Sequence, residues 1–122
     1  MTQEFIPYEQ ALELKELGFD EPCLSYYEGE IFSYHLATMT SGDDYTIPAP
    51  LFQQAFRWFR EKYNFIIEIR NWTGEDQNQW YYMIHHNNQL IPWRWVENKS
   101  YEEAELACLI KLIEIVKGGN NE

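Results

Sequence analysis

Aromatic side chains gather in the second half of the chain, where their types and spacing could support ring stacking. Trp72, Trp80, Tyr82, Trp93 and Trp95 fall in three consecutive segments that have strand character. Alternate side chains of a strand share a face, so each of the last two segments presents a pair of rings on one face. Flat rings with polar tips stack on a base, a sugar or a proline, and they also anchor protein interfaces. The alternative is ordinary cross-strand packing in a core.

Two arginines could supply the charge that an anionic ligand needs. Arg57 and Arg60 are three positions apart in a predicted helix and share its polar face. Guanidinium groups bind carboxylate or phosphate through paired hydrogen bonds, so this pair could hold an anion. Surface pairing with the many acidic side chains is the ordinary alternative.

The other reactive side chains show no catalytic or metal-binding spacing. His85 and His86 are adjacent on a predicted strand and point to opposite faces, and His35 is far away in the sequence. Cys23 and Cys108 form no CxxC pair and fall in apolar patterns, which predicts two small buried side chains in a reducing compartment. The serines, glycines and carboxylates match no known catalytic motif. We therefore predict no catalytic residue, no metal and no cofactor.

The net charge of the chain limits the classes of molecule that it can bind. Twenty acidic residues against nine basic ones give a formal charge of −11. Such a surface repels phosphate backbones and anionic lipids, and it attracts a protein with a basic surface. The alternative is that the acidity serves only solubility. We find no secretory signal at Met1 and no stretch of about 20 apolar residues, so we expect a cytoplasmic protein of a host cell and no membrane contact.

The periodicity of apolar residues predicts the elements that position these side chains. We expect an α+β fold, a mainly antiparallel five-stranded sheet with about three helices packed on it, in a single domain over residues 1–122 with a short polar tail at 118–122. Phe32 and Tyr34 should face the core. Gly18 should end the first helix, and Glu28-Gly29-Glu30 should form a tight turn. The predicted helices are 7–17, 50–63 and 100–117, and the predicted strands are two within 23–39, then 65–72, 79–86 and 90–97.

The last helix carries two apolar stripes. Leu106, Ile110 and Ile113 lie almost opposite the stripe that contains Cys108. One helix face cannot hold both stripes, so the second one meets either another element of the domain or a second copy in a homodimer.

Several stretches resemble a known family. These are Ile6-Pro7-Tyr8 with residues 11–22 (ALELKELGFDEP), then 55–63 (AFRWFREKY), 101–109 (YEEAELACL) and 111–117 (KLIEIVK). They are similar to a family of small proteins of tailed phages, prophages and related mobile elements, for which no activity is known. The resemblance covers somewhat under half of the chain and excludes the aromatic strands. It implies a genetic context and assigns no functional residue.

Two functions from different classes remain open. The first is a non-enzymatic acidic binding protein that occupies a surface of a host or viral protein, for example as an inhibitor of a host nucleic-acid enzyme or defence factor. The second is a binder that sequesters a nucleotide-like ligand between Trp and Tyr rings with help from Arg57 or Arg94. An enzyme would require a cleft with convergent titratable groups, and no motif predicts one.

Overall fold

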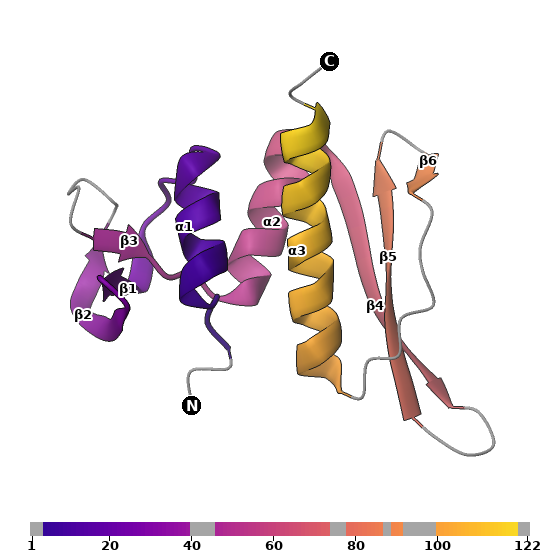
Figure 1. Cartoon of the computed structure of the whole chain (residues 1–122), viewed down its shortest axis with the longest axis horizontal. Coiled ribbons are helices and arrows are strands. Elements are labelled where there is room, and N and C mark those ends of the chain that lie inside the picture. Colours follow the sequence, from indigo (N-terminus) through magenta and orange to yellow (C-terminus); the bar gives the residue numbers. More distant parts are fainter. Residues whose placement is uncertain (1–3, 40–45, 74–77, 87–88, 92–99, 120–122) are drawn as a thin grey trace. The chain divides into compact units, whose positions relative to one another are not determined.

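The computed structural model describes residues 4–39, 46–73, 78–86, 89–91 and 100–119. These residues form three α-helices and six β-strands, and the strands belong to two antiparallel sheets (Figure 1). The chain divides into two compact units, which we call unit 1 (residues 1–55) and unit 2 (residues 56–122).

Unit 1 begins with helix α1, Tyr8–Glu16, which ends in a hydrogen-bonded cap. Gly18 has a φ of +101°, a conformation that glycine adopts without steric cost. Its amide donates to the Lys15 carbonyl and the Phe19 amide donates to the Leu14 carbonyl, each at 3.0 Å. This is the bond pattern of a Schellman motif, and the two apolar side chains that the motif brings together, Phe19 and Leu14, are buried. The predicted stop at Gly18 is confirmed.

The first sheet has the strand order β2-β1-β3. Strand β1, Cys23–Glu28, lies between β2, Ile31–Met39, and β3, Thr46–Pro48, and both pairings are antiparallel. The strands predicted from the sequence do not include β3. Pro48 is tolerated there because β3 is an edge strand, in which a missing amide need not break the ladder.

Strands β1 and β2 are joined by a two-residue turn. Glu28 is opposite Ile31, and Gly29, the first of the two turn residues, has a φ of +62°. Glycine at that position is the signature of a type II′ turn, whose twist matches that of the flanking strands. The predicted hairpin is therefore confirmed.

Near this turn, β2 is more accessible than the sequence predicted. Phe32 is half-buried and Tyr34 is 61% exposed, although their rings contact each other at 5.1 Å between centroids and both contact Phe5. On the other face of β2, Ile31 is 69% exposed. The prediction of a core position is wrong for Tyr34, because an edge strand has a neighbour on one side only and its rings are covered incompletely.

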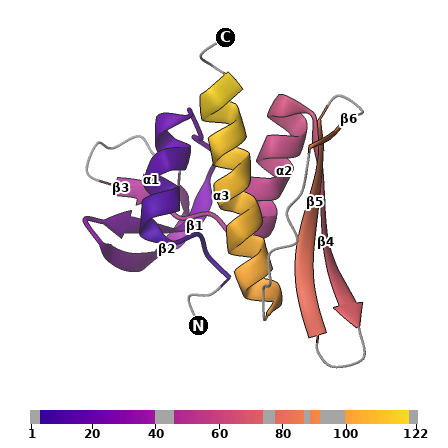
Figure 2. The ribbon, with the colours of Figure 1, turned by 45° about the vertical axis from the view of Figure 1, so that its right-hand side comes forward.

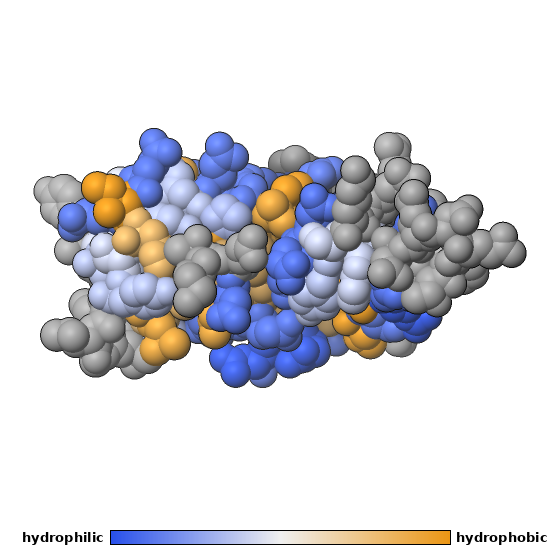
Figure 3. All heavy atoms as spheres, turned by 90° about the horizontal axis from the view of Figure 1, so that it is seen from below, coloured by the Kyte–Doolittle hydropathy of each residue, from blue (hydrophilic) through white to orange (hydrophobic). Residues whose placement is uncertain are grey.

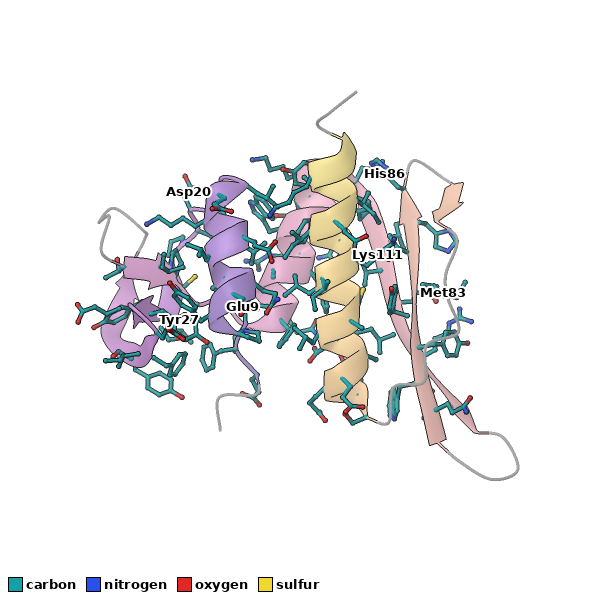
Figure 4. All side chains as sticks on the ribbon, in the orientation of Figure 1. Glu9, Asp20, Tyr27, Met83, His86 and Lys111 are labelled. Carbon is teal, nitrogen blue, oxygen red and sulfur yellow. The ribbon has the colours of Figure 1, made fainter. Side chains whose placement is uncertain are left out.

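Hydrogen bonds hold the interior of unit 1 together. The Tyr27 hydroxyl donates to the Ile6 carbonyl at 2.8 Å, and its ring meets the Tyr8 ring of α1 edge-on at 5.5 Å. The Ser25 hydroxyl donates to the Ala49 carbonyl at 3.1 Å, and the Ala49 amide donates back to the Ser25 carbonyl at 3.0 Å. Figure 4 shows Tyr27 on the side of the sheet that faces α1. These bonds join β1 to the segments before α1 and after β3.

Unit 2 contains the rest of α2, a three-stranded meander and α3. Helix α2 spans Phe52–Tyr63 and is followed by Asn64 at a φ of +63°. The Glu103 amide donates to the Ser100 hydroxyl at 3.1 Å, which caps the start of α3 close to the predicted helix start. The antiparallel meander is also confirmed, with the order β4-β5-β6. The remaining bounds are β4 Phe65–Thr73, β5 Asn78–His86, β6 Gln89–Ile91 and α3 Tyr101–Gly119.

The β4–β5 pair has one face toward helices. Ile67 is opposite Ile84 and Ile69 is opposite Tyr82, so these side chains share a face. Ile84 is buried and α3 contacts both strands. In Figure 2 the part of α2 that belongs to unit 2 and α3 lie on the same side of the β4–β5 pair.

The predicted α+β class, the antiparallel pairing and the three helices are confirmed among the described residues. The single five-stranded sheet is wrong. The strands form two three-stranded sheets, because each pairs with neighbours close in the sequence and α2 separates the two sets. The predicted fifth strand begins within β6, and its remainder, residues 92–97, lies outside the described residues. The prediction of a single domain with a polar tail stays a prediction.

Candidate functional site

The aromatic side chains predicted for ligand stacking are only partly described. Trp80 and Tyr82 lie on the β5 face that also carries the buried Ile84. The Trp80 ring meets the Tyr101 ring of α3 edge-on, with 5.4 Å between centroids and an interplanar angle of 86°. Both side chains are half-buried. The structure therefore places them on the helix-covered face, where they contribute to packing.

The other predicted tryptophans give no side-chain geometry. Trp72 is in β4 opposite Gln79, and only its backbone position is described. Trp93 and Trp95 lie outside the described residues. The prediction that these rings form one binding site with Trp80 and Tyr82 stays a prediction.

Arg57 and Arg60 project from α2 and are exposed, as the helical periodicity predicted. Beside them, the Lys62 ammonium lies 5.1 Å from the centroid of the Trp58 ring and 5.8 Å from that of the Tyr63 ring. These distances suit cation–π attraction. The basic residues of α2 thus form a local cationic stretch in unit 2.

Helix α3 has one broad buried face. Ala104, Cys108 and Leu112 are buried as expected, and so are Leu109 and Ile113. At 100° per residue these positions span about half of the helix circumference.

The interpretation of α3 as two opposite apolar stripes is therefore wrong for Ile113, which belongs to the buried face. Leu106 is half-buried at its margin, and Ile110 is 41% exposed. The homodimer contact through these three residues stays a prediction.

Three side chains that could act as nucleophiles or metal ligands take part in packing: Cys23, Cys108 and His86. Cys23 and Cys108 are free and buried, as predicted. Burial, with a smaller contribution from the Glu21 charge, raises the pKa of the Cys23 thiol to about 12, and burial likewise raises the pKa of Cys108. A thiol needs a lowered pKa to react at neutral pH. The His86 ring lies over the Phe65 ring at 4.4 Å. Within the described ranges, no three His, Cys, Asp or Glu side chains are grouped as metal ligands.

The outer face of the β4–β5 pair carries a polar group that the sequence did not indicate. The Arg70 guanidinium donates two hydrogen bonds to Glu68 Oε1, at 2.9 and 2.6 Å. Side-chain hydrogen bonds to Glu68 and to Tyr81, which is opposite Arg70, raise the pKa of Arg70. Ile66, two positions before Glu68, is 53% exposed. Surface pairs of this kind contribute little to stability.

The net negative charge is concentrated in unit 1, because nearly all of the basic side chains belong to unit 2. Residues 1–55 contain ten carboxylates and one basic side chain, Lys15, a net charge of −9. Residues 56–122 contain ten carboxylates and eight basic side chains, a net charge of −2, so the two values account for the total of −11. The Lys15 ammonium donates to the Thr46 carbonyl at 3.0 Å. The sequence analysis used only the total charge, and a count of charged residues on each side of residue 55 would have revealed this asymmetry.

The β1–β2 hairpin combines this charge with exposed apolar side chains. Leu24 is 52% exposed on the same face of β1 as Glu28, and Ile31 is opposite Glu28. Glu28 and Glu30 are exposed at the turn. We call Leu24, Glu28, Glu30 and Ile31, together with Tyr34 on the opposite face of β2, the hairpin surface. In Figure 3, apolar atoms lie among hydrophilic ones over the part of the molecule that contains β1 to β3, at the left of the view.

Figure 4 marks two further acidic residues of unit 1, Glu9 on α1 and Asp20 beyond its cap. Both are exposed. The carboxylates thus extend over α1 and the segment that follows it as well as over the hairpin.

Comparison with known proteins found no matching family, no similar curated protein and no similar solved structure. Among the described helices, none is both long enough and apolar enough to cross a membrane.

Proposed function

We propose that this protein is a non-enzymatic binding protein of a phage or related mobile element, and that unit 1 occupies a basic surface of a host or viral protein. The observation that carries the proposal is the net charge of −9 on residues 1–55, whose single basic group donates to a backbone carbonyl of the same unit. Such a surface steers a basic partner toward it and repels acidic ones.

The hairpin surface supplies the apolar part of the contact. Protein interfaces combine a few anchoring apolar or aromatic side chains with a polar rim. Ile31 and Tyr34 are large, accessible side chains within a few residues of the exposed carboxylates of Glu28 and Glu30. A basic partner therefore finds both kinds of contact on one hairpin.

The chemistry of the nucleophilic groups supports a binding role over catalysis. Cys23 is kept protonated by its raised pKa, and the Ser25 hydroxyl is buried and donates to the Ala49 carbonyl. The resemblance of the helical segments to small phage proteins supports the genetic context. Host enzymes and defence factors that act on nucleic acids carry basic surfaces for the phosphate backbone, so one of these is the partner class we propose.

The position of the charge can be tested with two variants of equal net charge. Glu9→Gln, Glu28→Gln and Glu30→Gln together neutralise three exposed carboxylates of unit 1. The matched control changes three exposed carboxylates of unit 2, with Glu61→Gln, Glu102→Gln and Glu114→Gln. We expect tagged wild-type protein and the unit 2 variant to capture the same stoichiometric protein from host lysate at low salt. The unit 1 variant should capture at least about tenfold less, because the charges that attract the partner are gone.

The capture is repeated at high salt, where screening should weaken it. Equal capture by the two variants would show that the position of the charge is irrelevant and would contradict the proposal. Native mass spectrometry of the purified protein provides a second check. A retained small molecule without a protein partner would favour the ligand-sequestering alternative.

A further inference from the structure

The free edge of strand β2 lacks the charged residues and the proline that usually protect an edge strand, and its pairing with β1 is regular from the turn to Tyr34, beyond which the register shifts. In the described part of unit 1, β2 pairs with β1 on one side only. Edge strands are usually short, or they carry lysine, proline or other charged residues that discourage a further strand. Strand β2 has nine residues, IFSYHLATM, and contains no proline, lysine, arginine or carboxylate. The regular part of β2, residues 31–34, is therefore a template for an additional strand.

The turn geometry indicates which backbone groups face the free edge. In a two-residue hairpin the residues that flank the turn, here Glu28 and Ile31, exchange hydrogen bonds, and bonded pairs alternate with non-bonded ones along the ladder. The pair Tyr26 and Ser33 is then bonded. Phe32 and Tyr34 belong to the non-bonded pairs. Their backbone amide and carbonyl groups therefore point away from β1 and are available to a new strand.

The other edges are less suited to a partner. Strand β3 is three residues long, ends in Pro48 and contacts α1. Strand β4 carries the Glu68–Arg70 ion pair and belongs to unit 2, whose net charge is close to zero. Strand β6, the other edge of unit 2, is three residues long. Among the described edge strands, β2 alone combines an uncharged sequence of more than three residues with a unit of net charge −9.

We propose that β2 binds its partner by strand addition, and that the partner supplies an extended segment in which basic and apolar residues alternate. This inference rests on the proposed function and names its binding mode. A strand added beside β2 brings its side chains within about 5 Å of those of β2 on both faces, where Ile31 and Tyr34 are exposed. Its basic residues meet the carboxylates at the turn and in the rest of unit 1.

Charge complementarity selects this occupant over a second copy of the chain. Two β2 edges could pair with each other, but each belongs to a unit with a net charge of −9 and brings no cation to the contact. Like charges at such a contact oppose association, whereas lysine or arginine in the added strand favours it. The backbone supplies the hydrogen bonds and the charge selects the partner.

A peptide pair separates backbone pairing from charge. The probe is an eight-residue peptide in which lysine alternates with valine, blocked at both ends. The control has the same sequence with N-methylated valines, so its charge is unchanged and alternate amides cannot donate. We expect the probe to bind in an NMR titration and to slow amide exchange at Phe32 and Tyr34. The control should bind at least about tenfold more weakly, because several backbone hydrogen bonds are lost.

A protein variant tests the same edge. Tyr34→Pro removes an outward amide together with the ring, and Tyr34→Ala removes the ring alone. We expect the alanine variant to keep the amide-dependent preference for the probe over its N-methylated control and the proline variant to lose most of it. Circular dichroism must show both variants folded. The N-methylated peptide pair keeps the test valid if the proline variant does not fold, because it uses the unaltered protein.

Three results would overturn the proposal that a basic partner strand adds to β2. Equal binding of the two lysine peptides would reduce the contact to charge and leave the proposed acidic binding function standing. Slowed amide exchange in β4 instead of β2 would show that the peptide adds to the edge of the other sheet. A dimer of the protein alone with slowed exchange at Phe32 and Tyr34 would make a second copy the occupant. Failure of the proposed function has its own sign, equal capture by the two glutamate variants, so it is distinguishable from failure of strand addition.

Discussion

Tyr27 illustrates how one polar atom ties unit 1 together. Its hydroxyl donates to the Ile6 carbonyl at 2.8 Å in a buried position, and burial raises the pKa of the phenol. We expect Tyr27→Phe to lower the free energy of unfolding by about 1 kcal/mol, because the Ile6 carbonyl loses its partner away from water. Urea unfolding followed by circular dichroism measures the change.

The chain offers a matched control at Tyr34, whose side chain is largely exposed. Tyr34→Phe removes the same atom from a position that water reaches, and it should change the free energy of unfolding by less than about 0.5 kcal/mol. Equal losses of free energy of unfolding in the two variants would mean that the buried hydrogen bond from Tyr27 does not stabilise unit 1 more than an exposed hydroxyl does.

For single residues, the sequence predicted which side chains share a strand face better than it predicted which face a helix covers. Alternation placed Trp80 and Tyr82 on one face, and the register shows that they share it. Alternation cannot say which face a helix covers, because both faces of β5 carry large side chains. The ring contact between Trp80 and Tyr101 depends on where α3 packs, and that information is spread over the whole of unit 2.

Helix ends are where single residues control an element. Gly18 closes α1 at a φ of +101°, a conformation that costs a residue with a Cβ atom about 1 kcal/mol or more. We expect Gly18→Ala to lower the free energy of unfolding by that amount while leaving α1 formed. Urea unfolding measures the loss, and circular dichroism checks the helix content.

Gly118 provides the opposite case. It lies in the last turn of α3, and a Cβ atom added there would meet nothing within 4 Å. Gly118→Ala should leave the free energy of unfolding unchanged or raise it by up to about 0.5 kcal/mol, because alanine loses less conformational entropy than glycine in a helix. A loss at Gly118 as large as at Gly18 would refute the argument from backbone conformation.

Local signals explain why most elements were predictable. Gly18 marked the end of α1 and Gly29 marked the hairpin, each through chemistry within a few residues, and the cap that Ser100 gives α3 is equally local. Strand β3 carries no such signal, since Pro48 and the following prolyl segment resemble a connection. Its strand character comes from pairing with β1, about twenty residues earlier, which a local pattern does not contain.

For the whole molecule, the sequence gives the total charge, but the structure is needed to assign that charge to compact units. The total of −11 indicated a basic partner, and the structure adds the division at residue 55 that concentrates −9 in one unit. The division into two sheets was likewise hidden, because a pattern of strands does not say which ones share a ladder. Composition thus predicted a class of partner, and the fold is needed to propose where it binds.

The same concentration of charge has a consequence for stability that is independent of any partner. Mutual repulsion among the carboxylates of unit 1 opposes its compact state, and salt screens it, since the Debye length falls from about 30 Å at 10 mM to about 8 Å at 150 mM ionic strength. We expect the free energy of unfolding to rise by roughly 1 kcal/mol over this range. Urea titrations at the two salt concentrations measure the rise.

The two triple variants used for the capture experiment identify where the repulsion arises. Glu9→Gln with Glu28→Gln and Glu30→Gln should reduce the salt-dependent rise markedly, because it relieves repulsion within a unit that has one cation. Glu61→Gln with Glu102→Gln and Glu114→Gln should reduce it less, because eight basic side chains already balance unit 2. Equal reductions would mean that the repulsion is spread over the whole chain, and the separate acidic character of unit 1 would then have no energetic basis.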